Sequence, residues 1–150
     1  MDEMQSISEL REKCKAYGLE DHEMLDSFTL AEIAREYNGA GPDSWLPDAR
    51  DLLTALMTLF KPVVLIHDMQ FALSDGTDDG FEHTVAVWKN NTRIILDAEY
   101  PLFTMKMLSR EYRAKRTYWF GVMLAANKAI STTAARKAWL EAYEKRKALS

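Results

Sequence analysis

The spacing of apolar and polar residues in the first forty positions predicts two helices. Apolar residues recur at helical spacing over about 8–17, and Gly18 follows them, a residue that readily takes the left-handed conformation found at helix ends. A second helix is expected from Thr29, because Glu32 stands three residues later, at the spacing of a capping box. This helix should end near Asn38, where glycines and a proline follow.

A run of apolar residues in the middle of the chain permits two structures. Pro47 is well placed to open a third helix, which carries an apolar stripe of leucines and Phe60. After Pro62, four apolar residues over 63–66 suit a buried strand as well as a helix, and periodicity cannot decide between them. We favour a helix over about 62–73, because proline suits a first helical turn and the apolar residues continue without a break.

The rest of the chain predicts further helices and no long strand. A polar, turn-rich loop over 74–80 should lead into a helix over about 81–96. A long helix is expected over about 102–130, in which Gly121 permits an interruption, and a last one over about 133–149. The predicted fold is therefore all-α, a single domain over 1–150, with a short hairpin in the loops as the one exception allowed.

Composition fits this prediction and adds an expected location. The chain has 150 residues, of which 47% are hydrophobic and 28% charged, as in ordinary globular proteins with a real core. The single cysteine, Cys14, cannot build a disulfide framework and is expected to be a small structural residue of the first helix. The acidic N-terminus lacks a signal-peptide pattern and no apolar run is long enough to span a bilayer, so we expect a cytoplasmic protein.

Charge is distributed unevenly along the chain. Residues 1–103 hold 8 Lys and Arg against 20 Asp and Glu, a net of −12, whereas residues 104–150 hold 11 against 3, a net of +8. We favour the interpretation that the two segments pack together and neutralise each other. The alternative is that the basic segment attracts an anionic partner, either lipid or nucleic acid. Overall acidity makes nucleic acid the weaker choice.

Few sequence signatures of chemistry are present. The chain has no glycine loop of Walker spacing, no Rossmann fingerprint, no HExxH motif and no paired CxxC. Its histidines, His22, His67 and His83, are too widely separated to suggest a zinc site. The remaining centre is His67-Asp68, since histidine can take a proton near neutral pH and aspartate is a hard oxygen ligand suited to calcium. Adjacent helical residues point about 100° apart, so the two side chains would serve separate tasks.

Four short motifs occur in order around this pair. They are Asn38-Gly39-Ala40-Gly41-Pro42-Asp43-Ser44-Trp45, Ile66-His67-Asp68-Met69-Gln70-Phe71, Lys89-Asn90-Asn91 and Arg113-Ala114-Lys115-Arg116-Thr117-Tyr118-Trp119. The first two resemble the calcium loop and His-Asp helix of phospholipase A2-like proteins. The whole set, over roughly 28–125, more closely resembles small phage and prophage proteins with that core.

This resemblance implies a fold, a cofactor and roles for particular residues. The His67 helix and the helix after the 75–80 loop would form an antiparallel pair, with additional N- and C-terminal helices. His67 would be the general base that activates water for attack on an ester carbonyl. Asp68 and the backbone carbonyls around Gly39 and Gly41 would hold Ca²⁺, which stabilises the oxyanion together with a loop N–H. The implied activity is calcium-dependent hydrolysis of a phospholipid or related ester.

Two departures from the family pattern keep a second hypothesis open. Phe71 replaces a tyrosine of the family, and the aspartate that should orient His67 has Thr84 nearest its place. Glu82 could supply that carboxylate if the helix register permits. Otherwise the chain would be an inactive scaffold or binding protein that contacts phage proteins or a membrane.

The basic stretch over 110–120 provides the contact surface for that hypothesis. Arg113, Lys115 and Arg116 could meet anionic lipid headgroups beside Tyr118 and Trp119, although we favour core packing for these two aromatic residues. The oligomeric state does not follow from the sequence.

Overall fold

The computed structural model describes residues 2–37 and 50–150, and within these ranges every regular element is a helix. The all-α prediction is confirmed for this part of the chain. The α-helices are α1 (Glu3–Tyr17), α2 (Leu30–Glu36), α3 (Arg50–Leu59), α4 (Lys61–Ala72), α5 (Asp78–Glu99), α6 (Arg110–Ala129) and α7 (Thr133–Ala148). Two short 3₁₀ helices, η1 (His22–Ser27) and η2 (Met105–Leu108), stand between them.

Most helix ends follow from the side chains beside them. Gly18 closes α1 in the left-handed conformation, with φ 67°, as expected for a glycine after a helix. The predicted capping box is present at α2, where the Thr29 hydroxyl accepts from the Glu32 N–H and the Glu32 carboxylate accepts from the Thr29 N–H. The Thr132 hydroxyl caps α7 by accepting from the Ala135 N–H, without a reciprocal side-chain bond.

The long helix expected over 102–130 is shorter than predicted. It begins only at Arg110, because the Ser109 side chain accepts from the Tyr112 N–H and η2 occupies the preceding residues. The interruption permitted near Gly121 is also absent: α6 runs through it, and no atom crowds this glycine. The first helix starts earlier than predicted, at Glu3, because Asp2 caps it.

The run after Pro62 forms a helix rather than a strand. Proline lies in the first turn of α4, where its missing N–H costs no intrahelical hydrogen bond. All nine residues from 62 to 70 are buried, including three polar ones. A helix buried on every side has no polar face, which explains why periodicity could not identify it.

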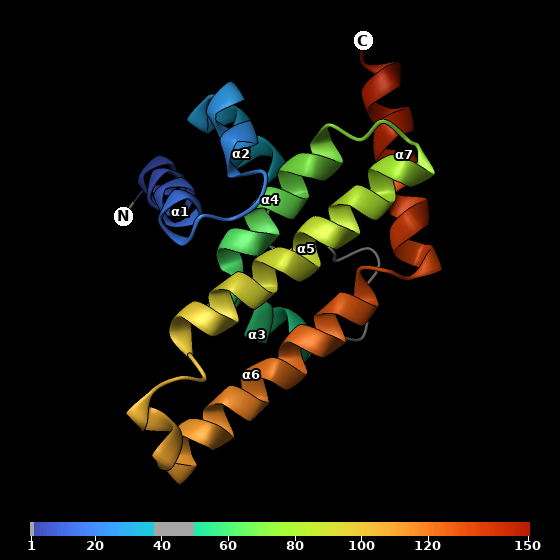
Figure 1. Cartoon of the computed structure of the whole chain (residues 1–150). Helices are drawn as coiled ribbons and strands as arrows, with labels where there is room; N and C mark the ends of the chain where they lie inside the picture. The colour runs from blue at the N-terminus through green and yellow to red at the C-terminus, as the bar shows by residue number, and fades with distance from the viewer. Residues whose placement is uncertain (1, 38–49) are drawn as a thin grey trace.

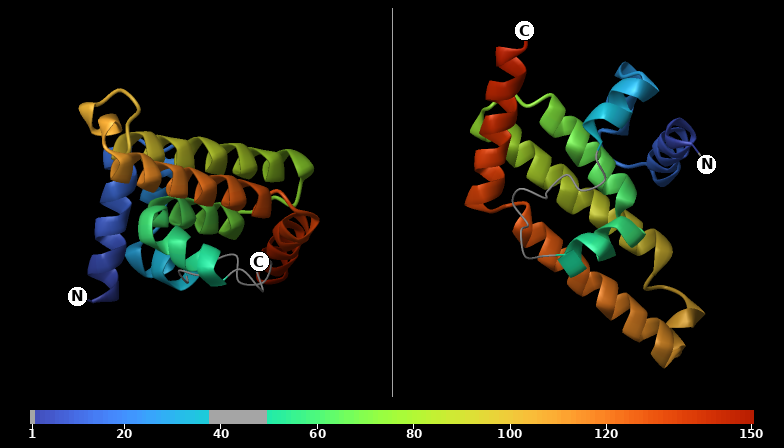
Figure 2. Two further views of the ribbon diagram at one scale, coloured as in Figure 1. Left: turned by 90° about the horizontal axis from the view of Figure 1, so that it is seen from below. Right: turned by 180° about the vertical axis from the view of Figure 1, so that it is seen from behind.

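Helix α4 lies at the centre of the fold and packs against α1, α2, α3, α5, α7 and η1. Figure 1 shows α4 and α5 side by side and antiparallel, joined by the short connection over 73–77. Helix α6 returns along α5, and α7 packs across the end where α4 meets α5 (Figure 2). The residues between these helices form one hydrophobic cluster, whose largest fully buried members include Phe60, Leu65, Ile66, Met69, Phe81, Trp88 and Leu96.

Cys14 belongs to this core, as expected. It is fully buried on α1, and its thiol lies 3.5 Å from the carbonyl oxygen of Pro62 on α4. Burial raises the pKa of this thiol to about 12, so the thiolate that reacts as a nucleophile is scarce near neutral pH.

No single helix in the described ranges has the length and apolar composition needed to cross a bilayer. Helices α3 and α4 pass that test only as a pair bent by 104°.

Candidate functional site

His67 lies in the middle of α4, between two aromatic side chains. Its ring centroid is 4.5 Å from that of Phe71, one turn along the same helix, and 5.0 Å from that of Trp88 on α5. Only 4% of the residue is exposed, and this burial lowers the pKa of the imidazole to about 3. The ring is therefore neutral at physiological pH, packed as an aromatic member of the α4–α5 interface.

Asp68 is buried beside it, and its environment favours the protonated carboxyl group. The residue is 8% exposed, and burial raises its pKa to about 8. Its Oδ2 atom has no hydrogen-bond partner in the part of the chain that the structure describes. The Tyr37 hydroxyl has none there either, and the negative charge of Asp68 adds to burial in raising the pKa of this tyrosine. Among the described residues, one carboxyl oxygen of Asp68 on α4 and the hydroxyl of Tyr37 after α2 thus lack partners, and the two residues lie near each other.

The structure places the other predicted catalytic residue, Glu82, on the exposed side of α5. Its carboxylate accepts from Arg136 on α7 at 2.6 Å, and Arg136 also binds Asp78 at 2.6 Å. Thr84, which stands nearest the expected aspartate, is buried and donates its hydroxyl to the Phe81 carbonyl at 2.7 Å. That Glu82 orients His67 stays a prediction, and in the structure the Glu82 carboxylate pairs with Arg136.

The predicted calcium ligands Gly39 and Gly41 lie outside the described residues. In the ranges 2–37 and 50–150, no group of three or more His, Cys, Asp or Glu side chains could hold a metal ion. Among the predicted ligands, only Asp68 is placed. The calcium site therefore stays a prediction, with one orphaned carboxyl oxygen as the feature that fits it.

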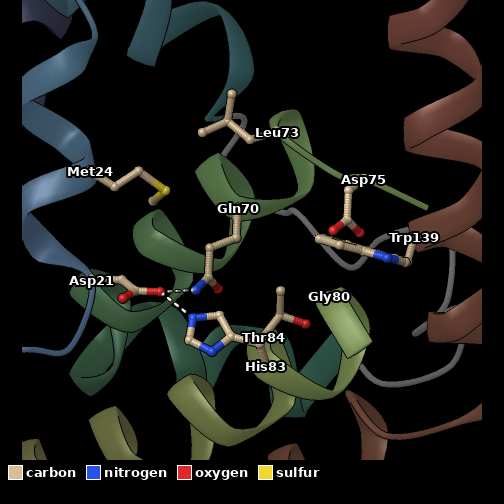
Figure 3. Close-up of a pocket in the computed structure, with 9 residues that line it drawn as sticks. All are labelled: Asp21, Met24, Gln70, Leu73, Asp75, Gly80, His83, Thr84 and Trp139. Carbon is tan, nitrogen blue, oxygen red and sulfur yellow. Dashed lines mark hydrogen bonds and ion pairs between the residues drawn. The ribbon is translucent and has the colours of Figure 1, made fainter. Parts of the chain in front are cut away.

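A second group of polar residues, which the sequence did not indicate, lines an open pocket of about 200 Å³ (Figure 3). Asp21 Oδ2 accepts from Gln70 Nε2 at 2.9 Å and pairs with His83 Nε2 at 2.8 Å. Asp21 has φ 65°, a left-handed conformation that Asp tolerates better than most residues. The residues lining the pocket are Asp21, Met24, Gln70, Leu73, Asp75, Gly80, His83, Thr84 and Trp139.

The hydrogen bonds of this pocket connect helices and do not form a recognisable catalytic arrangement. Asp21 connects the start of η1 to α4 through Gln70 and to α5 through His83. The Thr84 hydroxyl is engaged by a backbone carbonyl and is not offered as a nucleophile. Asp21 and His83 stand 62 residues apart, so no local motif could have revealed the pair.

The basic stretch over 110–120 divides between core and surface. Trp119 packs edge-on against Phe60, with 6.1 Å between ring centroids, as the core-packing prediction expected. Arg116 is largely covered and binds the Tyr100 carbonyl and Asp97. The core-packing prediction is wrong for Tyr118, which is 58% exposed and lies on the solvent side of α6. The side chain of Lys115 pairs with Glu111 at the surface.

No family model, curated protein or solved structure matches the chain. The fold and site define an all-helical protein with a buried His-Asp pair on its central helix.

Proposed function

We propose that the chain is a phospholipase A2-like protein of phage or prophage type that acts by binding rather than by catalysis. The burial of His67 between Phe71 and Trp88 carries this proposal. A general base must meet the water it activates and hold the proton that it takes. Burial lowers the pKa of the imidazole to about 3, so it is a far weaker proton acceptor than an ordinary histidine.

The surroundings of His67 support the same function. Phe71 contacts Trp139 as well, with 5.1 Å between ring centroids, so the residue at the family's tyrosine position serves as an apolar link between α4 and α7. Glu82 pairs with Arg136 and thereby holds α7 against α5. In this function, α4 and α5 form a rigid core, and the exposed surface of the protein binds a partner.

An ester-hydrolysis assay tests this function. The purified chain with Ca²⁺ should hydrolyse phospholipid or short-chain ester substrates no faster than buffer does. His67→Gln is the informative variant and His22→Gln its control, with the fold of each checked by circular dichroism. Calcium-dependent turnover that His67→Gln abolishes and His22→Gln retains would overturn the proposal.

One observation favours a second function, the calcium-assisted ester hydrolase. A buried carboxyl oxygen without a hydrogen-bond partner is costly, and a bound cation would satisfy it. In this function Asp68 and the carbonyls of Gly39 and Gly41 would hold Ca²⁺, which supplies charge stabilisation for an oxyanion. His67 would accept the proton of the attacking water.

Thermal unfolding with and without Ca²⁺ tests this second function separately. An ion that binds only the folded protein raises the melting temperature as its concentration rises. The second function requires a rise with Ca²⁺ that Mg²⁺ does not reproduce and that Asp68→Asn removes. A melting temperature that is the same with Ca²⁺ as with Mg²⁺ would exclude a calcium-specific site at Asp68.

A further inference from the structure

The connection between α5 and α6 presents an unusual concentration of exposed apolar side chains. Four exposed large apolar residues lie within seven positions, and we refer to residues 102–108 as the apolar tip. The exposed fractions are 48% for Leu102, 101% for Phe103, 79% for Met105 and 74% for Leu108. The tip projects from the end of the α5–α6 pair, beyond the body of the helices (Figures 1 and 2). Contiguous exposed apolar groups mark interaction sites more often than scattered ones do.

The tip is held in place by hydrogen bonds from α6. Arg113 Nη1 donates to the Met107 carbonyl at 2.7 Å, and the Tyr112 hydroxyl donates to the Pro101 carbonyl at 2.8 Å. Arg116 Nε donates to the Tyr100 carbonyl at 2.8 Å. These bonds satisfy backbone carbonyls around the tip, so its apolar side chains point outward from an ordered backbone. Their exposure belongs to the folded structure.

Both charged residues within 100–110 are basic. Lys106 lies within the apolar tip and Arg110 directly after it, both exposed, and residues 100–110 contain no acidic residue. The nearest carboxylates in sequence already have partners: Glu99 accepts from the Tyr17 hydroxyl, and Glu111 pairs with Lys115. Lys106 and Arg110 form no ion pair in the described part of the chain, and an apolar group flanked by such basic side chains is complementary to an anionic lipid surface.

We propose that the apolar tip docks on an anionic lipid bilayer. Phe103, Met105 and Leu108 enter the boundary between headgroups and acyl chains, while Lys106 and Arg110 meet lipid phosphate groups. A projecting tip suits a deformable bilayer, whereas a protein partner would need a matching hollow. This inference rests on the proposed binding function and names its partner.

Vesicle co-sedimentation of the full chain tests the apolar contribution. Association with phosphatidylcholine vesicles should increase when phosphatidylserine is added. The double variant Phe103→Ser with Met105→Ser should weaken binding at least about tenfold, because two large apolar side chains no longer enter the bilayer. Leu140→Ser with Leu149→Ser is the matched control, since these residues are 48% and 82% exposed on and after α7. Equal binding by both double variants would overturn the proposal.

The charge contribution has its own pair of variants. Lys106→Glu with Arg110→Glu should weaken binding to the anionic vesicles by about tenfold or more, since each basic residue near such a surface contributes several-fold. Lys128→Glu with Lys145→Glu changes the total charge equally, at exposed positions away from the tip, and should have a smaller effect. A loss that depends only on total charge would show that binding is not directed by the tip.

A fluorescent variant reports the depth of docking. The emission of Phe103→Trp should shift to shorter wavelength with anionic vesicles, whereas Leu140→Trp should not shift. No association with vesicles of any composition would overturn the proposal. If Phe103→Ser then abolished self-association on a sizing column, the tip would be a contact between copies of the chain instead. Ester turnover with vesicle binding intact would contradict the proposed function alone, and inactivity without vesicle binding would contradict this inference alone.

Discussion

At His67 and Asp68, burial shifts two pKa values in opposite directions. The folded pKa of His67, about 3, lies below its ordinary 6.5, so its contribution to stability is lost as pH falls from about 6.5 to 3. The folded pKa of Asp68, about 8, lies above its ordinary 3.8, so its contribution is lost as pH rises from about 4 to 8. The two effects oppose each other between about pH 4 and 6.5, and Asp68 alone acts above that window.

We therefore expect Asp68→Asn to remove a loss of stability that the wild type shows as pH rises from about 4 to 8. Asparagine has no charge to bury, so the variant should be more stable than the wild type at pH 8, by about 1–3 kcal/mol. Near about pH 3.5, where the carboxyl group is largely protonated in the folded and the unfolded chain alike, the two proteins should be similar. Urea unfolding at several pH values in calcium-free buffer measures this difference. An equal difference at both pH values would show that Asp68 does not titrate in this range.

Two glycines make a contrasting prediction at the same scale. Gly76 has φ 70°, and a Cβ atom there would lie 2.6 Å from the Tyr143 ring. Gly76→Ala should therefore lower the free energy of unfolding by at least about 1 kcal/mol. Gly121 lies inside α6 with no atom near its Cβ position, so Gly121→Ala should stabilise by about 0.5–1 kcal/mol. Chemical denaturation measures the change in the free energy of unfolding for both variants. A change of the same sign in both would contradict this account.

Among whole elements, α7 depends on one aromatic side chain for its position. Trp139 is 5% exposed, its indole N–H donates to the Thr77 carbonyl at 2.9 Å, and its own carbonyl accepts from Ser74 at 2.7 Å. Its ring meets that of Phe71 on α4. The connection between α4 and α5 is thereby bound to α7.

Trp139→Ala should loosen α7 without unfolding α4 and α5. Removing a buried tryptophan costs about 3–5 kcal/mol, and the loss should appear first as faster amide hydrogen exchange in residues 133–148. Leu140→Ala, at the exposed neighbouring position, is the control and should change exchange little. Uniform acceleration over the whole molecule would mean instead that α7 and the core unfold together.

Sequence patterns predicted these elements well where the determinants are local. The capping box at Thr29 and the glycine at residue 18 act within one helical turn, and both appear as expected. The start of α6 was missed because it depends on whether Ser109 caps a new helix, which the apolar spacing of the segment does not reveal. Helix α4 was ambiguous because neighbours on every side remove its polar face.

The site was less accessible to sequence reasoning than the fold. His67 and Asp68 were identified as a pair, but a motif does not give their burial, which depends on the packing of Trp88 and other distant residues. The pairing of Asp21 with Gln70 and His83 likewise depends on three separate elements meeting. The sequence therefore predicted which residue types could carry chemistry. Their burial and their hydrogen-bond partners required the folded structure.

Over the whole molecule, the acidic and basic segments meet at a few exposed ion pairs. Arg136 binds Asp78 and Glu82, and Arg116 binds Asp97. Most of these side chains are substantially exposed, and exposed pairs contribute about 0–1 kcal/mol each. Among the described residues, only Arg116 and Arg136 of segment 104–150 pair with carboxylates of the acidic segment. Other basic side chains of this segment therefore remain available to an external anionic surface.

Salt should separate folding from docking. Ions screen exposed charges beyond about 10 Å at moderate salt, so long-range attraction to an anionic surface weakens steeply. Folding relies mainly on the buried apolar cluster, which salt leaves intact. We expect the urea midpoint to change little between low and high sodium chloride, while association with phosphatidylserine vesicles falls at least about tenfold. A large drop in the urea midpoint at high salt would show that ion pairs between the two segments hold the fold together. Vesicle association that salt does not change would show that the basic residues do not contribute to docking.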